Sequence, residues 1–137
     1  MIVTISRAAR ERILAHAAES PETEVCGLLF GNELKIINAL RTNNVTKNPA
    51  NSFEIDPAAL FTAIRAERDG GERIIGHYHS HPTGLAQPSV RDTEMALDTG
   101  RLWLIVADGE LGAWHALSPG HLEPVELALA SPSPNRH

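Results

Sequence analysis

The spacing of apolar side chains along this chain switches between a helical period and a strand period, and it predicts the secondary structure. Helical spacing occurs in residues 6–20, 57–69 and 89–100. The first two of these helices each follow an N-cap residue, Ser6 and Asp56. Leu60, Phe61 and Ile64 are expected to form the buried face of the second helix.

Apolar runs bounded by turn residues predict the strands. They are residues 1–5, 24–30, 34–40, 53–55, 73–81, 102–107, 110–117 and 121–127. Gly31-Asn32 and Asp108-Gly109 are turn signals, and each is expected to join two antiparallel strands. About seven or eight strands with three helices indicate a mixed α/β, or α+β, fold with a largely antiparallel central sheet and helices packed against it.

The length of the chain limits it to one core. With 137 residues, of which 42% are hydrophobic, a single domain is expected over residues 1–128. Residues 129–137 are rich in Ser and Pro and are predicted to be a disordered tail.

Charge and composition argue against several classes of protein. The net charge is −5 and the 12 Lys and Arg residues are scattered, so a general nucleic-acid binder is not expected. No apolar run reaches the length of about twenty residues that a membrane span needs, and the first residues lack a secretory signal. The single Cys agrees with a reducing compartment, so a cytoplasmic location is expected.

A candidate metal site lies in the segment GHYHSHPTGLAQPSVRD. His79 and His81 are two residues apart on a predicted strand, so their side chains leave the same face, with Cα atoms about 6 to 7 Å apart. Asp92 follows in the first turn of the next predicted helix. Two imidazole nitrogens and one carboxylate oxygen are the ligands of a catalytic zinc site, which keeps a fourth position for water. We therefore predict one zinc ion bound by His79, His81 and Asp92.

Other residues nearby leave alternatives open. Ser89 and Asp92 also have the spacing of a capping box, which would only begin a helix. His77 lies on the same predicted strand face as His79 and His81, so a three-histidine site is conceivable, as is a His77 that only packs beside the metal. Cys26 lies within an apolar strand, where a thiol is usually inert, so it is not favoured as a nucleophile. The histidines interpreted as structural or solvated are His16, His115, His121 and His137.

The histidine segment resembles the signature of a known family, the JAMM (MPN-plus) metallopeptidases. That signature is His-x-His-Pro followed, after a short spacer that begins with the Pro, by Ser-x-x-Asp, and this chain matches it from His79 to Asp92. Members also carry an upstream Glu, often before x-Cys-Gly at the start of an apolar strand. Glu24, which is followed by Val-Cys-Gly, fits this position better than Glu22. The resemblance extends over most of residues 1–128.

The resemblance implies a fold, a reaction and a partner. The fold is a cytidine-deaminase-like JAMM/MPN sandwich of the small prokaryotic type. The reaction is zinc-dependent hydrolysis of an amide, in which Glu24 moves a proton from water to the leaving amine and Ser89 donates to the oxyanion. The substrates are peptide or isopeptide bonds after the C-terminal Gly-Gly of ubiquitin-like or sulfur-carrier proteins, including the removal of a cysteine attached to such a tail.

Two other functions stay open as alternatives. A catalytically silent MPN-type scaffold would bind partners only. A RadC-like, DNA-repair-associated protein is the second, because His81-Pro82-Thr83-Gly84 resembles part of its motif, although the acidic charge and the Glu-x-Cys-Gly sequence argue against it. The polar stretch of residues 42–52 is either a plain connector or a flap that binds a partner. The sequence leaves the oligomeric state open.

Overall fold

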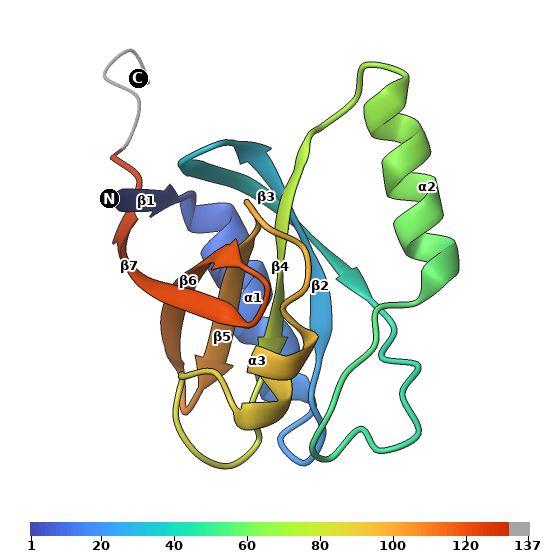
Figure 1. Ribbon diagram of the computed structural model, residues 1–137, viewed down its shortest axis with the longest axis vertical. Helices are drawn as coiled ribbons and strands as arrows, with labels where there is room; N and C mark the ends of the chain where they lie inside the picture. Colours follow the sequence, from blue (N-terminus) through green and yellow to red (C-terminus); the bar gives the residue numbers. More distant parts are fainter. Residues whose placement is uncertain (132–137) are drawn as a thin grey trace.

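Within residues 1–131, which the computed structural model describes, the chain forms seven strands and three helices (Figure 1). The helices are α1 (Arg7–Glu19), α2 (Pro57–Arg68) and α3 (Val90–Met95). The strands are β1 (Ile2–Ile5), β2 (Cys26–Asn32), β3 (Lys35–Thr42), β4 (Ile74–Ser80), β5 (Leu102–Ala107), β6 (Glu110–Ser118) and β7 (His121–Leu129). The predicted mixed α/β fold is confirmed. Among these helices, none is long and apolar enough to cross a membrane.

The strands close into a barrel in the order β1-β3-β2-β4-β5-β6-β7. Antiparallel pairing joins β2 to β3, β2 to β4, β5 to β6 and β6 to β7. Parallel pairing joins β1 to β3, β1 to β7 and β4 to β5. Strand β4, which carries two of the histidines, is therefore held by a neighbour on each side.

A β-bulge in β4 sets the directions of its side chains. The register between β2 and β4 shifts beside Gly76, and Ile75 has no partner on β2. Beyond the bulge, His77 and His79 share one face of β4, and their ring centroids lie 5.8 Å apart. Tyr78 points to the opposite face, into the main apolar core. The bulge therefore lets Ile75 and Tyr78, three residues apart, both face the main core, while His77 and His79 lie on the other face.

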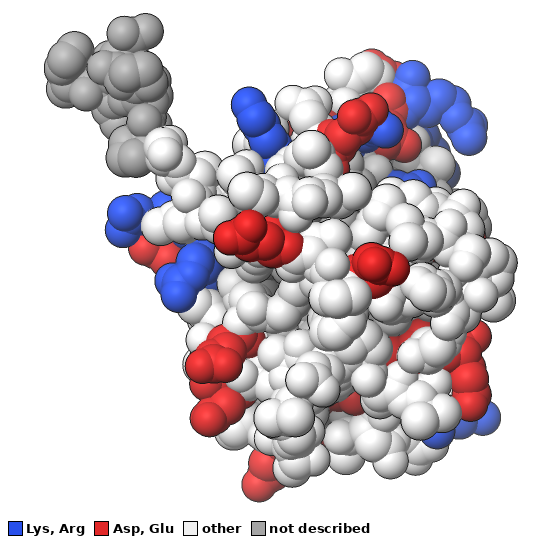
Figure 2. All heavy atoms as spheres, turned by 60° about the vertical axis from the view of Figure 1, so that its left-hand side comes forward, with Lys and Arg blue, Asp and Glu red and all other residues white. Residues whose placement is uncertain are grey.

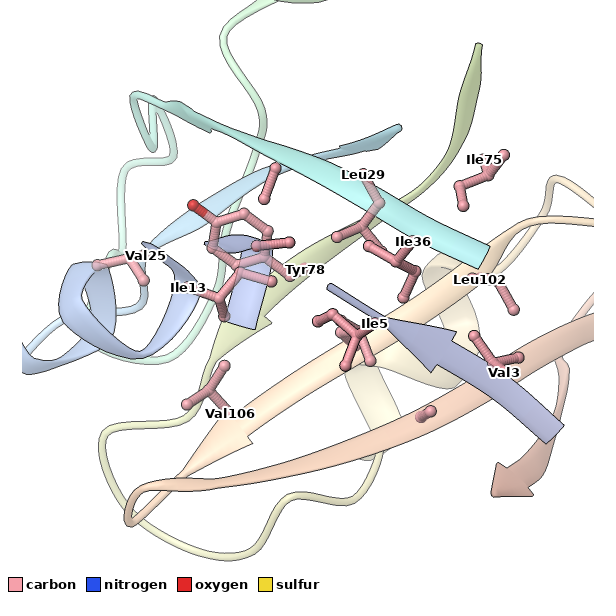
Figure 3. Packing of buried hydrophobic residues seen from close by; sticks show 14 residues of the cluster. Val3, Ile5, Ile13, Val25, Leu29, Ile36, Ile75, Tyr78, Leu102 and Val106 are labelled. Carbon is pink, nitrogen blue, oxygen red and sulfur yellow. The ribbon is translucent and has the colours of Figure 1, made fainter. Parts of the chain in front are cut away.

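Helix α1 packs against the barrel and completes the main core, as Figure 3 shows for Ile13 and the strand residues around it. Tyr78 is fully buried in this core, and its hydroxyl oxygen lies 2.7 Å from Nδ1 of His16. The Tyr78 ring requires Gly27 on the neighbouring strand, because a Cβ at that position would overlap the ring. The other labelled core residues are Val3, Ile5, Val25, Leu29, Ile36, Ile75, Leu102 and Val106.

Helix α2 covers a second, smaller apolar cluster. It contains Leu28, Phe30, Ala63 and Ile74, with Ile55, Leu60 and Ile64 packed against them. The prediction of a buried face is right for Leu60 and Ile64 but wrong for Phe61, which is 63% exposed. Residues 60, 63 and 64 form one stripe along α2, and Phe61 lies outside that stripe.

Helix α3 is shorter than predicted. It ends at Met95 rather than near Gly100. The cause is tertiary contact, because Ala96 is buried against Trp103 and its carbonyl accepts a hydrogen bond from the backbone N–H of Gly120. These contacts direct the chain out of the helix.

Other boundaries also differ from the predictions. The turn between β2 and β3 lies at residues 33–34, and Gly31-Asn32 pairs within the hairpin instead. The strand predicted at residues 53–55 is reduced to one isolated bridge between Asn44 and Ile55. Strand β7 extends to Leu129, so it includes the first residue of the predicted tail. Residues 132–137 of that tail lie outside the described residues.

Candidate metal centre

Two histidines and one aspartate meet at the C-terminal end of β4. His79 lies on β4, His81 follows the strand directly, and Asp92 is in the first turn of α3, beside the end of β4 (Figure 1). Nε2 of His79 lies 3.2 Å from Nε2 of His81 and 3.2 Å from Oδ2 of Asp92. Nε2 of His81 lies 3.0 Å from the same oxygen. The structure thus brings the three predicted ligand atoms to one point.

Asp92 belongs to a capping box as well as to this cluster. Its backbone N–H donates to Oγ of Ser89 at 3.1 Å, and its Oδ2 accepts from the backbone N–H of Ser89 at 2.9 Å. The two interpretations of this sequence spacing are therefore compatible, since the cap holds the carboxylate in place while Oδ2 faces the histidines. The cap uses a lone pair of the Ser89 hydroxyl, and its proton is free to donate.

The hydrogen bonds around His81 and Asp92 fix the tautomer of the His81 ring and keep the Asp92 carboxylate ionised. Nδ1 of His81 lies 2.9 Å from the carbonyl oxygen of Leu85, which can only accept, so Nδ1 carries a proton. In the neutral ring, Nε2 then holds the free lone pair. Burial alone would raise the pKa of Asp92, but hydrogen bonds with His79 and His81 outweigh it and keep this pKa far below its usual range.

Aromatic side chains enclose His79, which is fully buried. The Phe53 ring stacks on it with centroids 4.3 Å apart and planes 16° apart, and the Trp103 ring forms a T-shaped pair with it, with centroids 5.8 Å apart. Burial lowers the pKa of His79, so the ring is neutral. Its Nδ1 is buried without a hydrogen-bond partner in residues 1–131.

His77 lies in the same aromatic wall. Its ring centroid is 4.3 Å from that of Trp103 and 5.2 Å from that of Phe53. Burial lowers the pKa of His77 to about 3. It is not among the ligand atoms that meet at the end of β4, and its position is that of a packing residue beside them.

Glu24 is buried next to the cluster, just before β2, and is 6% exposed. One carboxylate oxygen of Glu24 and one ring nitrogen each of His79 and His81 lie within 4.8 Å of one another. Oε1 of Glu24 is buried and has no hydrogen-bond partner in the described part of the chain. Burial raises the pKa of Glu24 to about 7, and the negative charge of Asp92 adds to this effect while His81 opposes it. Glu22, by contrast, is exposed.

The donor set is compatible with a metal ion. Zinc binds imidazole nitrogen and carboxylate oxygen at about 2.0–2.2 Å, which places tetrahedral ligand atoms about 3.4 Å apart. The separations of 3.0 and 3.2 Å in this cluster need only a small expansion. A cation would also stabilise the ionised Asp92 and the unpartnered oxygen of Glu24.

A cavity of about 400 Å³ opens beside the cluster. It borders His77 and Asp92. Its other walls are largely apolar and include Phe53, Ile55, Leu60, Phe61, Met95 and Trp103. A larger cavity, of about 620 Å³, lies at the opposite end of β4 around Ile74 and Ile75 and contains none of the predicted site residues.

The sequence pattern does not identify Phe53 as part of the site. Its only signal is an isolated aromatic residue directly after a long polar loop, and the polar residues give no indication that the ring folds back onto His79.

Cys26 is fully buried, with Sγ 3.5 Å from Oγ1 of Thr42. Burial raises the pKa of the Cys26 thiol, which keeps it in the unreactive protonated form.

Comparison with known proteins identifies relatives along most of the chain. Residues 6–118 match the domain family described as prokaryotic homologs of the JAB domain. The desampylase of Haloferax volcanii is 34% identical over 118 residues, which are 81% of this chain and 85% of that protein. The desampylase of Pyrococcus furiosus is 29% identical over 86% of this chain and 84% of that protein. A probable TtuB-protein conjugate cleaving protease of Thermus thermophilus is 31% identical over 70% of this chain and 64% of that protein.

Solved structures share the fold. The solution structure of a protein from Desulfitobacterium hafniense matches with a TM-score of 0.80 and 28% identity, and the match covers 98% of this chain and 96% of that one. A JAB1/MPN domain protein from Archaeoglobus fulgidus matches with a TM-score of 0.62 and 21% identity over 94% of this chain and 97% of that one. From the match over residues 6–118, together with the relative in Haloferax volcanii, we conclude that the chain belongs to the prokaryotic JAB-domain family, as its histidine segment predicts.

Proposed function

We propose that this protein is a zinc-dependent peptidase that cleaves peptide or isopeptide bonds after the C-terminal Gly-Gly of ubiquitin-like or sulfur-carrier proteins. The observation that carries the proposal is the meeting of Nε2 of His79, Nε2 of His81 and Oδ2 of Asp92, with the carboxyl group of Glu24 buried beside them. The expected enzyme class, a JAMM-type metallo-isopeptidase, is confirmed by the family match and by relatives named as desampylases and as a protease that cleaves TtuB–protein conjugates.

His79, His81 and Asp92 would hold a single zinc ion. When bound, zinc lowers the pKa of a water molecule toward about 7 and polarises a substrate carbonyl. The protein prepares its own groups for this role. The carbonyl of Leu85 orients the ring of His81, the capping box orients Asp92, and the stacked ring of Phe53 restrains His79.

Glu24 is the proposed proton carrier. A general base works best when its pKa lies near the working pH, and burial raises that of Glu24 to about 7. Its unpartnered Oε1 can accept the proton of the attacking water. The same carboxyl group can then deliver the proton to the leaving amine, which must be protonated before it departs.

Ser89 is the proposed donor to the oxyanion. Its hydroxyl lies on an exposed residue at the start of α3, and the capping bond leaves the hydroxyl proton unused. A donor of this kind is typically worth about 3 kcal/mol of transition-state stabilisation.

The surroundings of the site agree with a substrate tail that ends in Gly-Gly. Glycine has no side chain to clash with the rings of Phe53 and Trp103, so its backbone can approach the cluster closely. The apolar cavity beside Asp92 offers room for a larger side chain further along the tail.

Cleavage of a Gly-Gly-tailed ubiquitin-like fusion by the zinc-loaded protein tests the proposal. We expect cleavage after the second Gly, loss of activity with a chelator and recovery on adding zinc. Glu24→Gln should keep zinc and lose at least about a hundredfold in kcat, which is the usual contribution of a general base. Glu22→Gln, a change at an exposed carboxylate two residues away, is the matched control and should leave kcat unaltered.

Two outcomes would contradict the proposal. Turnover that survives Glu24→Gln would remove Glu24 from its role. Stoichiometric zinc without cleavage of any Gly-Gly conjugate would favour the silent MPN-type scaffold.

The RadC-like alternative would need a basic stripe that binds phosphates. On the face drawn in Figure 2, the described Lys and Arg residues lie only near the margins and form no such stripe.

A further inference from the structure

We infer that Asn44 is a positioning residue, which holds the backbone of Glu24 and of Phe53 in the site through one side-chain amide. Its Nδ2 donates to the carbonyl oxygen of Glu24 at 2.9 Å and to that of Ser52 at 3.0 Å. Its Oδ1 accepts from the backbone N–H of Glu54 at 2.9 Å and from that of Thr46 at 3.2 Å. The inference rests on the proposed function, because it concerns how Glu24 is aimed.

Glu24 depends on this loop because it lies outside the sheet. Strand β2 begins at Cys26, and Val25 is the first residue tied to β4, through hydrogen bonds with Ser80. The backbone N–H of Glu24 donates instead to the carbonyl oxygen of Pro49 at 2.6 Å. Both backbone groups of Glu24 are therefore held by the loop of residues 43–52, one by Pro49 and one by Asn44.

Phe53 is held from both sides by the same amide. Ser52 and Glu54 flank it in the chain, and Asn44 bonds to the carbonyl of the first and to the N–H of the second. The Phe53 ring stacks on His79 at 4.3 Å. Asn44 thus fixes the position of Glu24, the proposed proton carrier, relative to Phe53, whose ring packs on the predicted ligand His79.

Asparagine has the hydrogen-bond donors and acceptors that this position requires. Its amide offers two N–H donors and an oxygen with two lone pairs, and all four are used here. An aspartate could accept from Thr46 and Glu54 but could not donate to Glu24 or Ser52. Asn44→Asp therefore removes the link to Glu24 while keeping the acceptor half of the network.

The experiment compares Asn44→Asp with Thr46→Val. The second variant loses the contact of 3.0 Å between Oγ1 of Thr46 and Oγ of Ser52 in the same loop but leaves every bond of Asn44 in place. For each protein we measure zinc content, kcat and KM on a Gly-Gly-tailed fusion, and hydrogen exchange of individual backbone amides by NMR. If Asn44→Asp does not fold, Asn44→Ala, which removes the same donors without adding charge, takes its place.

For Asn44→Asp we expect faster exchange of the Glu24 amide, because its bond to Pro49 opens more often once the carbonyl of the same residue is released. The amides of Thr46 and Glu54 should stay protected, since an aspartate oxygen can still accept from them. Zinc content should be unchanged, kcat should fall about 10- to 100-fold and KM should stay within about twofold, because a small misplacement of a reacting group mainly affects the chemical step. Thr46→Val should change neither kcat nor the exchange of Glu24. In a Glu24→Gln background, Asn44→Asp should lower kcat by a smaller factor than it does in the wild type, since the part of its effect that acts through Glu24 is already lost.

Three results would overturn the inference. Glu24 exchange at the wild-type rate in Asn44→Asp would show that Asn44 does not hold it. An equal fall of kcat in Thr46→Val would show that any loosening of the loop has the same effect. A fall of kcat in the Glu24→Gln background as large as that in the wild type would show that Asn44 does not act through Glu24. If the wild-type protein cleaves no conjugate, the proposed function fails by itself, and the exchange data alone decide whether Asn44 positions Glu24.

Discussion

Replacing Glu24 by glutamine should stabilise the metal-free protein while removing its proposed proton carrier. The Glu24 side chain is 6% exposed, and its Oε1 has no hydrogen-bond partner within residues 1–131. Ionising a carboxyl group in such a place costs free energy, and this is why its pKa rises from 4.5 to about 7. Glutamine has nearly the same shape and never ionises, so it avoids that cost.

The size of the effect follows from linkage. A carboxyl group whose pKa is higher in the folded state makes its full contribution to the stability of the fold below pH 4.5. It loses that contribution as the pH rises to about 7. Relative to a carboxyl group that stays protonated, a rise of this size lowers the free energy of unfolding by about 3 kcal/mol at pH 8 and by about 1 kcal/mol at pH 5. Glu24→Gln should therefore be more stable than the wild type by a margin that grows by about 2 kcal/mol between these pH values.

Urea unfolding of both chelator-treated proteins at pH 5 and pH 8 measures this margin. Groups whose titration does not depend on the charge of Glu24 cancel in the comparison. Glu22→Gln serves as the control because Glu22 is exposed. If the stability difference between Glu24→Gln and wild type is the same at both pH values, the carboxyl group is not desolvated and the argument for its tuned basicity is wrong.

Further predictions concern the metal and the core. His79→Ala should lose zinc by elemental analysis, and the rise of Tm on adding zinc, which corresponds to about 2.7 kcal/mol at a hundredfold excess over Kd, should disappear. Gly27→Ala should lower the free energy of unfolding by about 1–3 kcal/mol in urea, since the added Cβ would overlap the Tyr78 ring. Cys26→Ala should cost about 1 kcal/mol of stability and leave kcat within about twofold of wild type, because the thiol is buried packing.

Local signals in the sequence were sufficient for several elements. Ser6 and Asp56 cap α1 and α2 as predicted, because an N-cap acts within its own turn. The apolar run of residues 102–107 is strand β5. His79 and His81 converge because a strand sends alternate side chains to one face, which is also a local property.

Other features depend on contacts between distant residues, and no local pattern reveals them. Ala96 leaves α3 because two residues later in the chain hold it, Trp103 on β5 and Gly120 in the turn between β6 and β7. Closure of the barrel requires β1 to pair with β7, the first strand with the last. The bonds of Asn44 reach back to Glu24 and forward to Glu54, although its neighbours look like an ordinary polar connector.

One oxygen atom, Oδ2 of Asp92, accepts a hydrogen bond from the backbone of Ser89 and also faces both histidines. The capping of α3 and the placement of the third predicted ligand thus depend on the same atom. Transfer of this candidate site to another scaffold therefore requires the whole segment from the end of β4 to the first turn of α3. The His-x-His pair alone would lack the turn that positions Asp92.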